Sequence, residues 1–316
     1  MEASAYFANK SYVALPFSRE YFRAVKAASG DAVFVDGGNA ELVESPTDSL
    51  QFIRTAAVKF SGKKRLWMMK SEFYAKTTTA ISGNDAVYST RIENAKGGLV
   101  SEIKMSAVAI SEGGRMQASK MGNIARRVLE LKMAADAAEK EKNAVIVLDG
   151  TLEAVFEGED RHLQQLYDAA EKNGNIVVAV AKTNTVLATD GRLFAETLEK
   201  NQPAGAWRYG NVAEVTSDRH RAELEFVKLH EKSRHIFRLE VYKKQANEAE
   251  KAVNMLAMTA NDVTFPGYPY GLIIADRIAR VSESDAEYLK ARNIESEKMF
   301  KHGIRALNAH EILDSM

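Results

Sequence analysis

Three short segments of this chain are apolar at every position, which predicts β-strands that are covered on both faces. They are Ala32-Val33-Phe34-Val35, Ala144-Val145-Ile146-Val147-Leu148 and Ile176-Val177-Val178-Ala179-Val180-Ala181. Asp36-Gly37-Gly38 follows the first segment, and Asp149-Gly150 follows the second. Because Asp-Gly is a common turn dipeptide, we expect both strands to end there. The third strand ends at Lys182.

Between the first two segments the hydrophobic pattern changes twice. β-Branched and aromatic residues in partial alternation predict antiparallel strands over Leu66–Thr79, Ala86–Ile92 and Leu99–Ile110, and Gly113-Gly114 interrupts the pattern. From about Ser119 to Lys142 the period is helical, and one apolar stripe carries Ile124, Val128, Leu131, Ala135 and Ala138.

The second half of the chain mixes both periods. It predicts helices around Asp160 to Lys172 and near Phe194 to Lys200, strands over Ala222 to Leu229 and His235 to Tyr242, and a helix carrying Leu272 to Arg280. Early antiparallel strands followed by alternating helices and strands indicate an α/β fold, an RNase-H-like mixed sheet flanked by helices. Other α/β folds fit the same order of elements.

We expect one domain over residues 1–316. The RNase-H-like core comprises residues about 30–184 and 263–285. An inserted α+β segment comprises about 185–262, and a C-terminal helix comprises about 286–313.

Asp36 and Asp149 are the first candidates for chemistry, because ligands collect at the carboxyl ends of strands in such sheets. Two carboxylates held together repel each other unless a cation or a shared proton relieves the repulsion. The pair therefore marks either the centre of a divalent-metal site or two separate turns.

Three more charged residues extend this candidate site. Glu130 lies at the edge of the apolar stripe of its helix, where it is either a ligand or an i,i+4 partner of Arg126. Asp276 shares a helix face with apolar residues, so its charge needs a metal or an arginine. Lys182 either stabilises charge on a phosphoryl oxygen or neutralises the carboxylates.

Composition narrows the chemistry of this site. The chain has no cysteine, which excludes thiolate zinc sites and iron–sulfur clusters, and its six histidines lack zinc-site spacing. Carboxylates suit Mn²⁺ or Mg²⁺. The chain has neither a P-loop nor a Gly-x-Gly-x-x-Gly loop, so ATP and dinucleotide chemistry are not expected.

Charge and hydropathy bear on the partners. The 43 basic and 43 acidic residues argue against nucleic-acid binding by bulk charge but leave a local basic groove open. The chain has no apolar run of membrane-spanning length and no signal-peptide pattern at its start. We therefore expect a cytoplasmic protein without a membrane partner.

Four segments together resemble the successive motifs of the NurA family. They are Val33-Phe34-Val35-Asp36-Gly37-Gly38-Asn39, Val145-Ile146-Val147-Leu148-Asp149-Gly150-Thr151-Leu152, Val178-Ala179-Val180-Ala181-Lys182, and Gly267-Tyr268-Pro269-Tyr270-Gly271-Leu272 with Ala275-Asp276. The motifs occur in the family's order over residues 33 to 280.

This resemblance implies a Mn²⁺-dependent DNA nuclease, a 5′–3′ exonuclease and single-strand endonuclease, that forms a homodimer. It also implies a HerA-type hexameric ATPase as partner in DNA end resection and double-strand-break repair. By the same resemblance Asp36, Glu130, Asp149 and Asp276 are metal ligands, and Lys182 joins them as a catalytic residue. Glu102 is an alternative to Glu130.

Contacts with DNA are predicted at Arg126, Arg127 and Tyr268, and at Lys63-Lys64-Arg65 beside Trp67. Solvated charge is the alternative for the basic residues, and packing of a turn is the alternative for Tyr268. Two competing functions stay open. One is a non-catalytic subunit of this fold that binds DNA or the ATPase, and the other is an enzyme acting on RNA or branched DNA.

Overall fold

The computed structural model describes residues 2–45, 47–110, 117–182 and 185–292. They form two compact units. Unit 1 comprises Met1–Asp36, Ala57–Met69 and Leu131–Ala275, and unit 2 comprises Gly37–Ala56, Lys70–Glu130 and Asp276–Met316. The predicted break at Gly113-Gly114 and most of the predicted C-terminal helix lie outside the described residues.

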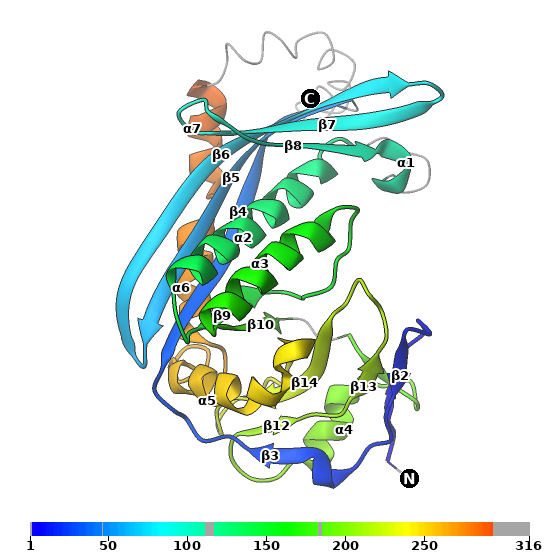
Figure 1. Ribbon diagram of the computed structural model, residues 1–316, viewed down its shortest axis with the longest axis vertical. Coiled ribbons are helices and arrows are strands. Elements are labelled where there is room, and N and C mark those ends of the chain that lie inside the picture. Colours follow the sequence, from blue (N-terminus) through cyan, green and yellow to red (C-terminus); the bar gives the residue numbers. More distant parts are fainter. Residues whose placement is uncertain (1, 46, 111–116, 183–184, 293–316) are drawn as a thin grey trace, which may run out of the picture. The chain divides into compact units, whose positions relative to one another are not determined.

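A mixed sheet forms the centre of unit 1 (Figure 1). Its strand order is β3-β12-β14-β15-β10-β9-β4-β5-β6. The bounds are β3 (Phe22–Ala24), β12 (Trp207–Tyr209), β14 (Ala222–Lys228), β15 (Phe237–Tyr242), β10 (Ile176–Ala181), β9 (Val145–Asp149), β4 (Asp31–Glu44), β5 (Asp48–Ser61) and β6 (Lys64–Ser82). The strands β4, β9 and β10 are parallel, and β15 is antiparallel to β10. The long strands β4, β5 and β6 contribute residues to both units.

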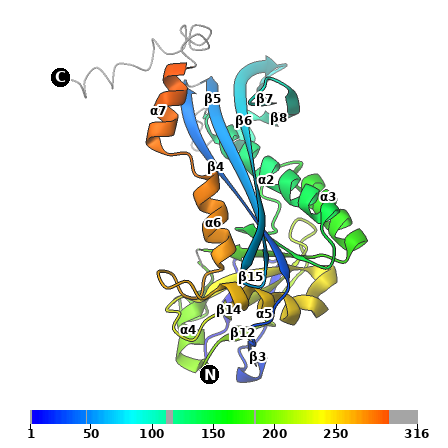
Figure 2. The ribbon, with the colours of Figure 1, turned by 90° about the vertical axis from the view of Figure 1, so that its left-hand side faces the viewer.

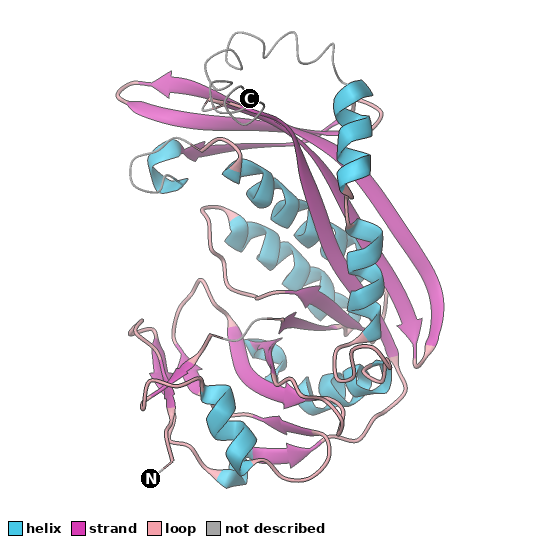
Figure 3. Ribbon diagram, turned by 180° about the vertical axis from the view of Figure 1, so that it is seen from behind, coloured by secondary structure: helices cyan, strands magenta, loops and turns pink. Residues whose placement is uncertain are grey.

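Helices cover both faces of the unit 1 sheet, because its central strands are apolar on both faces. Val33 and Val35 pack with the second half of α2 (Lys120–Lys140) and with α3 (Glu159–Asn173), which lie side by side in Figures 1 and 2. Phe34 points to the other face. There it contacts Gly271 at the start of α6 (Tyr270–Ala279), the helix that lies in front of the strands in Figure 3.

Smaller elements complete unit 1. The helices α4 (Phe194–Asn201) and α5 (Ala249–Thr259) belong to it, together with two-stranded sheets that pair β1 (Ala5–Tyr6) with β11 (Leu187–Ala188) and β2 (Tyr12–Ala14) with β13 (Ala213–Val215). One short 3-10 helix spans Arg19–Tyr21 and another spans Lys243–Glu248. Among the described residues, no helix is both long enough and apolar enough to span a membrane.

Unit 2 has an antiparallel sheet that continues β4, β5 and β6 into β7 (Asp85–Asn94) and β8 (Leu99–Ser106). It also contains α1 (Ala107–Ile110), the first half of α2, the end of α6 and α7 (Glu283–Arg292). A small core of Ile53, Ala75, Ile92, Ala125 and Leu129 joins the sheet to α2.

The structure confirms the mixed α/β sheet flanked by helices but corrects three local predictions. The strand β4 does not end at Asp36-Gly37-Gly38, because it continues to Glu44. The strand β5 was not predicted, because its buried polar residues Ser49, Gln51 and Thr55 hide the alternation. The predicted strand Leu99–Ile110 ends at Ser106, where α1 begins.

Candidate active site

Strand register brings Asp36 and Asp149 to neighbouring positions in unit 1. β4 and β9 pair in parallel with Val35 opposite Leu148, so the next residue of each strand is an aspartate. Neighbouring strands lie about 4.8 Å apart, and residues in register point to the same face. That face is the α6 side of the sheet, because Asp36 and Asp149 are each two residues beyond the paired Phe34 and Val147. Asp36 is only 6% exposed.

Lys182 and Tyr268 both meet Asp149. The Nζ atom of Lys182 lies 2.6 Å from Asp149 Oδ2 and 5.8 Å from the centre of the Tyr268 ring. The Tyr268 hydroxyl lies 3.4 Å from Asp149 Oδ1. The lysine therefore supplies a positive charge to a carboxylate pair that would otherwise repel itself.

The glycine after Asp149 forms the predicted turn. The strand β9 ends at Asp149, and Gly150 has a φ of 103°, a conformation that costs little only for glycine. Its N–H donates to the carbonyl of Val180 at 3.0 Å, which ties the turn to the neighbouring strand β10. The turn therefore holds the backbone of Asp149 beside the end of β10.

Gly37 has another role than the turn that we predicted. In unit 2 a Cβ atom at Gly37 would lie 2.6 Å from Glu130 Oε1 and 2.9 Å from Glu130 Cγ. The missing side chain therefore gives the Glu130 carboxylate its place against the β4 backbone. Arg126 Nε and Arg127 Nη1 each lie 3.8 Å from a Glu130 oxygen, and Arg126 Nη1 donates to the Gly37 carbonyl at 3.0 Å.

We expect Gly37→Ala to lower the activity proposed below by on the order of 10-fold, because displacement of a positioned group by even about 1 Å is costly. The fold should tolerate the change, since only two side chains, those of Glu130 and Arg126, must move. Melting temperature and cleavage rate would be measured together. Gly210→Ala is the control, because the backbone of Gly210 does not require glycine and the atom nearest to its Cβ position, Glu225 Oε1, lies 3.6 Å away. Wild-type cleavage by Gly37→Ala would show that the position of Glu130 has no effect.

Asp276 lies in the second half of α6, in unit 2. Arg280 Nη2 contacts its Oδ2 at 3.1 Å across one helical turn. A Cβ atom at Gly38 would lie 2.5 Å from the carbonyl oxygen of Ala279, so the α6 backbone packs directly on β4 there. Asp276 therefore has an arginine partner, and a metal-ligand role for Asp276 stays a prediction.

Glu102, the alternative to Glu130, has a different environment in unit 2. It lies on β8, its side chain is 44% exposed, and Lys104 Nζ lies 3.3 Å from its Oε1. Glu130 is buried and lies against the residue that follows Asp36 in the chain. These surroundings favour Glu130.

The donor set of unit 1 fits a hard divalent cation. The two adjacent carboxylates offer oxygen ligands, and the chain has no cysteine that could offer a thiolate. Within the described ranges no group of three or more His, Asp and Glu side chains has metal-binding geometry. The fit therefore rests on the carboxylate pair.

Tyr268 is almost fully buried, and its ring packs against Phe237 and Phe265. This favours the packing interpretation, with the added role of holding Asp149. A DNA contact at this residue stays a prediction. Nothing in the sequence pattern pointed to its contact with Asp149, since the two residues are far apart in the chain.

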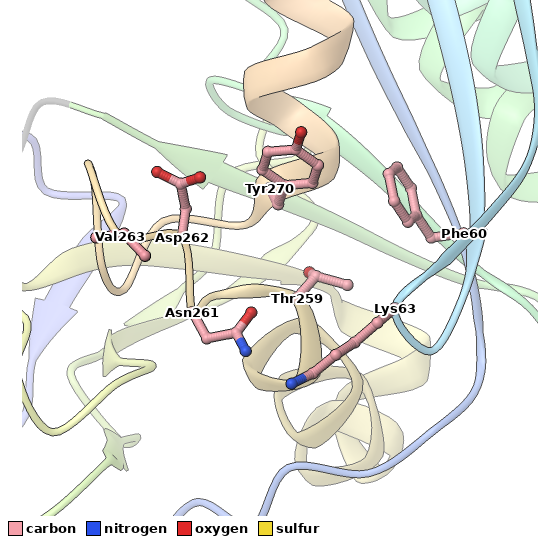
Figure 4. Close-up of a pocket in the computed structure, with 7 residues that line it drawn as sticks. All are labelled: Phe60, Lys63, Thr259, Asn261, Asp262, Val263 and Tyr270. Carbon is pink, nitrogen blue, oxygen red and sulfur yellow. The ribbon is translucent and has the colours of Figure 1, made fainter.

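Lys63, from the predicted basic run, lines a cavity of about 250 Å³ in unit 1 (Figure 4). Its ammonium group points toward Asn261, and the rings of Phe60 and Tyr270 form another wall. Trp67 is held by a hydrogen bond from its Nε1 to Glu141 Oε1 at 3.1 Å. The indole is therefore fixed, which does not favour base stacking there.

Fold and site together define the class of the protein, an RNase-H-like α/β fold with an acidic pair where the pairing of its parallel strands β4 and β9 ends. The sequence profile of the NurA domain matches residues 122–281, slightly more than half of the 316-residue chain. This chain belongs to the NurA family.

A solved nuclease structure shares this fold. The NurA nuclease from Sulfolobus solfataricus aligns over 89% of this chain and 88% of its own, with a TM-score of 0.51 and 15% identity. Endonuclease V from Ciona intestinalis, in complex with a 24mer DNA, aligns over 82% of this chain and 90% of its own, with a TM-score of 0.42 and 12% identity. No curated protein sequence matches the chain.

Proposed function

We propose that this chain is a metal-dependent DNA nuclease. The observation that carries the proposal is the pair Asp36 and Asp149, set side by side by the β4–β9 register with Lys182 at 2.6 Å from Asp149. Asp36 and Asp149 would hold a divalent ion, which would supply an activated water and stabilise the leaving oxygen in phosphodiester hydrolysis. Membership of the NurA family supports the same reaction.

The residues of the site have distinct proposed roles. Asp36 and Asp149 hold the metal, and Tyr268 fixes the orientation of Asp149. Lys182 neutralises Asp149 before metal binds and then stabilises negative charge on the phosphate. Glu130 and Asp276 are proposed as further ligands on the basis of the family motifs.

The finer proposals follow from the family. They are Mn²⁺ as the preferred ion with Mg²⁺ as a substitute, 5′–3′ exonuclease and single-strand endonuclease activity, and a homodimer. A HerA-type ATPase would supply translocation in DNA end resection, because this chain has no nucleotide-binding loop of its own. We propose that the protein carries out this activity in the cytoplasm.

The purified chain should degrade end-labelled single-stranded and double-stranded DNA when Mn²⁺ is added, and EDTA should stop the reaction. Substrates labelled separately at the 5′ and 3′ ends would give the polarity, and a circular single strand would reveal endonuclease activity. RNA and branched DNA are added to the same assay as competing substrates. Cleavage that persists in EDTA would contradict the proposed metal chemistry, and preferred cleavage of RNA would contradict the proposed substrate.

The alternative function is a non-catalytic subunit that binds DNA or an ATPase. It predicts DNA or ATPase binding without Mn²⁺ affinity and without cleavage. Titration calorimetry with Mn²⁺ separates the two proposals, because only the nuclease requires a bound ion.

A further inference from the structure

A second cavity of unit 1 has a volume of about 380 Å³, within the size range of small-molecule sites. Its aromatic wall comes from the N-terminal segment and includes Tyr6, Phe7 and Tyr12. The rings of Phe7 and Tyr12 stack at 5.2 Å, and Tyr6 is 52% exposed. Aromatic side chains presented in this way are the surfaces on which unpaired bases stack.

A network of hydrogen-bonded polar side chains includes residues of the cavity wall and holds them in place. Glu240 is fully buried, and His220 Nε2 lies 2.9 Å from its Oε2. On the other side of the His220 ring, Nδ1 lies 2.8 Å from the Tyr12 hydroxyl, which also donates to Glu153 Oε1 at 3.2 Å. Burial and the charge of Glu153 raise the pKa of the Tyr12 phenol, so this hydroxyl stays protonated as a donor.

Two charged groups on the cavity wall retain hydrogen-bonding capacity. Within the part of the chain that the structure describes, Glu153 Oε2 accepts no hydrogen bond, and Arg238 Nη1 and Nη2 donate none. A ligand with an amino group beside a ring nitrogen or carbonyl would satisfy both. A phosphate would not, because the Glu153 carboxylate would repel it.

The cavity lies next in the chain to the candidate catalytic residues. Glu153 is four residues after Asp149, and Thr185, on the cavity wall, is three residues after Lys182. Four residues of chain span at most about 14 Å, so Glu153 lies within that distance of Asp149. A nucleotide with its phosphate near Lys182 would have its neighbouring base within reach of the cavity.

We propose that this cavity is a subsite for an unpaired nucleobase of single-stranded DNA, next to the phosphate that the enzyme cleaves. The base stacks on the aromatic wall, its exocyclic amino group donates to Glu153, and Arg238 donates to its ring acceptor. Bases with an exocyclic amino group, such as cytosine, are bound in preference to thymine, because the single N3–H of thymine is flanked by two carbonyl oxygens and one of them would face the Glu153 carboxylate. The subsite rests on the proposed nuclease function for its role.

Binding without cleavage tests the subsite. Fluorescence anisotropy in EDTA would measure the affinity of labelled single-stranded oligonucleotides in which one abasic residue is moved through every position. The wild-type chain should lose affinity on the order of 10-fold when the abasic residue is at one position and little elsewhere. At that position cytosine should bind more tightly than thymine.

Two variants remove the proposed contacts. Tyr6→Ala should abolish the position-dependent loss, and Glu153→Gln should abolish the preference for cytosine over thymine. The matched controls are Tyr288→Ala, an exposed tyrosine of unit 2, and Glu157→Gln, an exposed glutamate in the same loop as Glu153. Both controls should keep the wild-type pattern.

Three results would overturn the subsite: no DNA binding by the wild-type chain, equal affinity wherever the abasic residue stands, or an unchanged pattern in Tyr6→Ala and Glu153→Gln. Because the assay contains no divalent ion, it does not depend on cleavage. Position-dependent binding without any nuclease activity in Mn²⁺ would remove the proposed function and leave the base-binding site in place.

Discussion

Replacing Asp149 by Asn is expected to lower the rate of Mn²⁺-dependent DNA cleavage by on the order of 10³-fold or more. The substitution keeps the size of the side chain but removes a charged ligand, and metal stabilisation of the transition state is worth several kcal/mol. Lys182, 2.6 Å from Asp149 Oδ2, would lose its partner as well. Mn²⁺ affinity, measured by calorimetry, should fall in parallel.

The same substitution should leave the fold intact. Neutralising one member of the Asp36–Asp149 pair relieves repulsion, which offsets the lost contact with Lys182, so stability in EDTA should change by less than about 1 kcal/mol. Asp160→Asn, at an exposed position in the first turn of α3, is the matched control and should cleave like the wild type. An Asp149→Asn variant that cleaves DNA at the wild-type rate would exclude Asp149 from catalysis.

Glu240→Ala is expected to destabilise the protein by about 3–5 kcal/mol, because it leaves buried partners without their counter-charge. The carboxylate accepts the Leu152 N–H at 2.6 Å, and Arg238 Nε lies 3.1 Å from its other oxygen. Burial opposes the charge of Glu240, but the hydrogen bond from His220 and the charges of His220 and Arg238 hold the pKa of its carboxyl below the usual value. The stabilisation is therefore present at neutral pH and is lost as the pH falls through that lowered pKa.

Urea unfolding at pH 7 measures this effect. Glu240→Gln should lose less, since its amide oxygen can still accept the Leu152 N–H. Glu214→Ala, at an exposed position of β13, controls for the loss of a glutamate from a strand and should change stability by less than about 0.5 kcal/mol. A loss below about 1 kcal/mol in Glu240→Ala would show that the network is not a source of stability.

The parts of the fold that the sequence predicted are those with an uninterrupted hydrophobic signal. The core strands β9 and β10 and the helices α2 and α3 follow directly from apolar runs and a helical period. The strand β5 escaped prediction because its polar side chains are buried by neighbours from elsewhere in the chain. Burial of a polar residue depends on tertiary structure, and no local sequence pattern predicts it.

Some features of the candidate site were likewise predictable from the sequence, and others were not. The sequence by itself determined that Asp36 and Asp149 follow buried strands, since apolar runs and Asp-Gly pairs are local features. Only the tertiary structure decided that Val35 pairs with Leu148, which makes the two carboxylates neighbours.

Tertiary structure also decided what the glycines after Asp36 and Asp149 do and which aromatic residue holds Asp149. Gly37 lies in a continuous strand and makes room for Glu130, whereas Gly150 does form the expected turn. Tyr268 meets Asp149 from a distant part of the chain. These contacts depend on strand register and on helices packing against the sheet, which are set by the whole chain and not by the residues on either side of each motif.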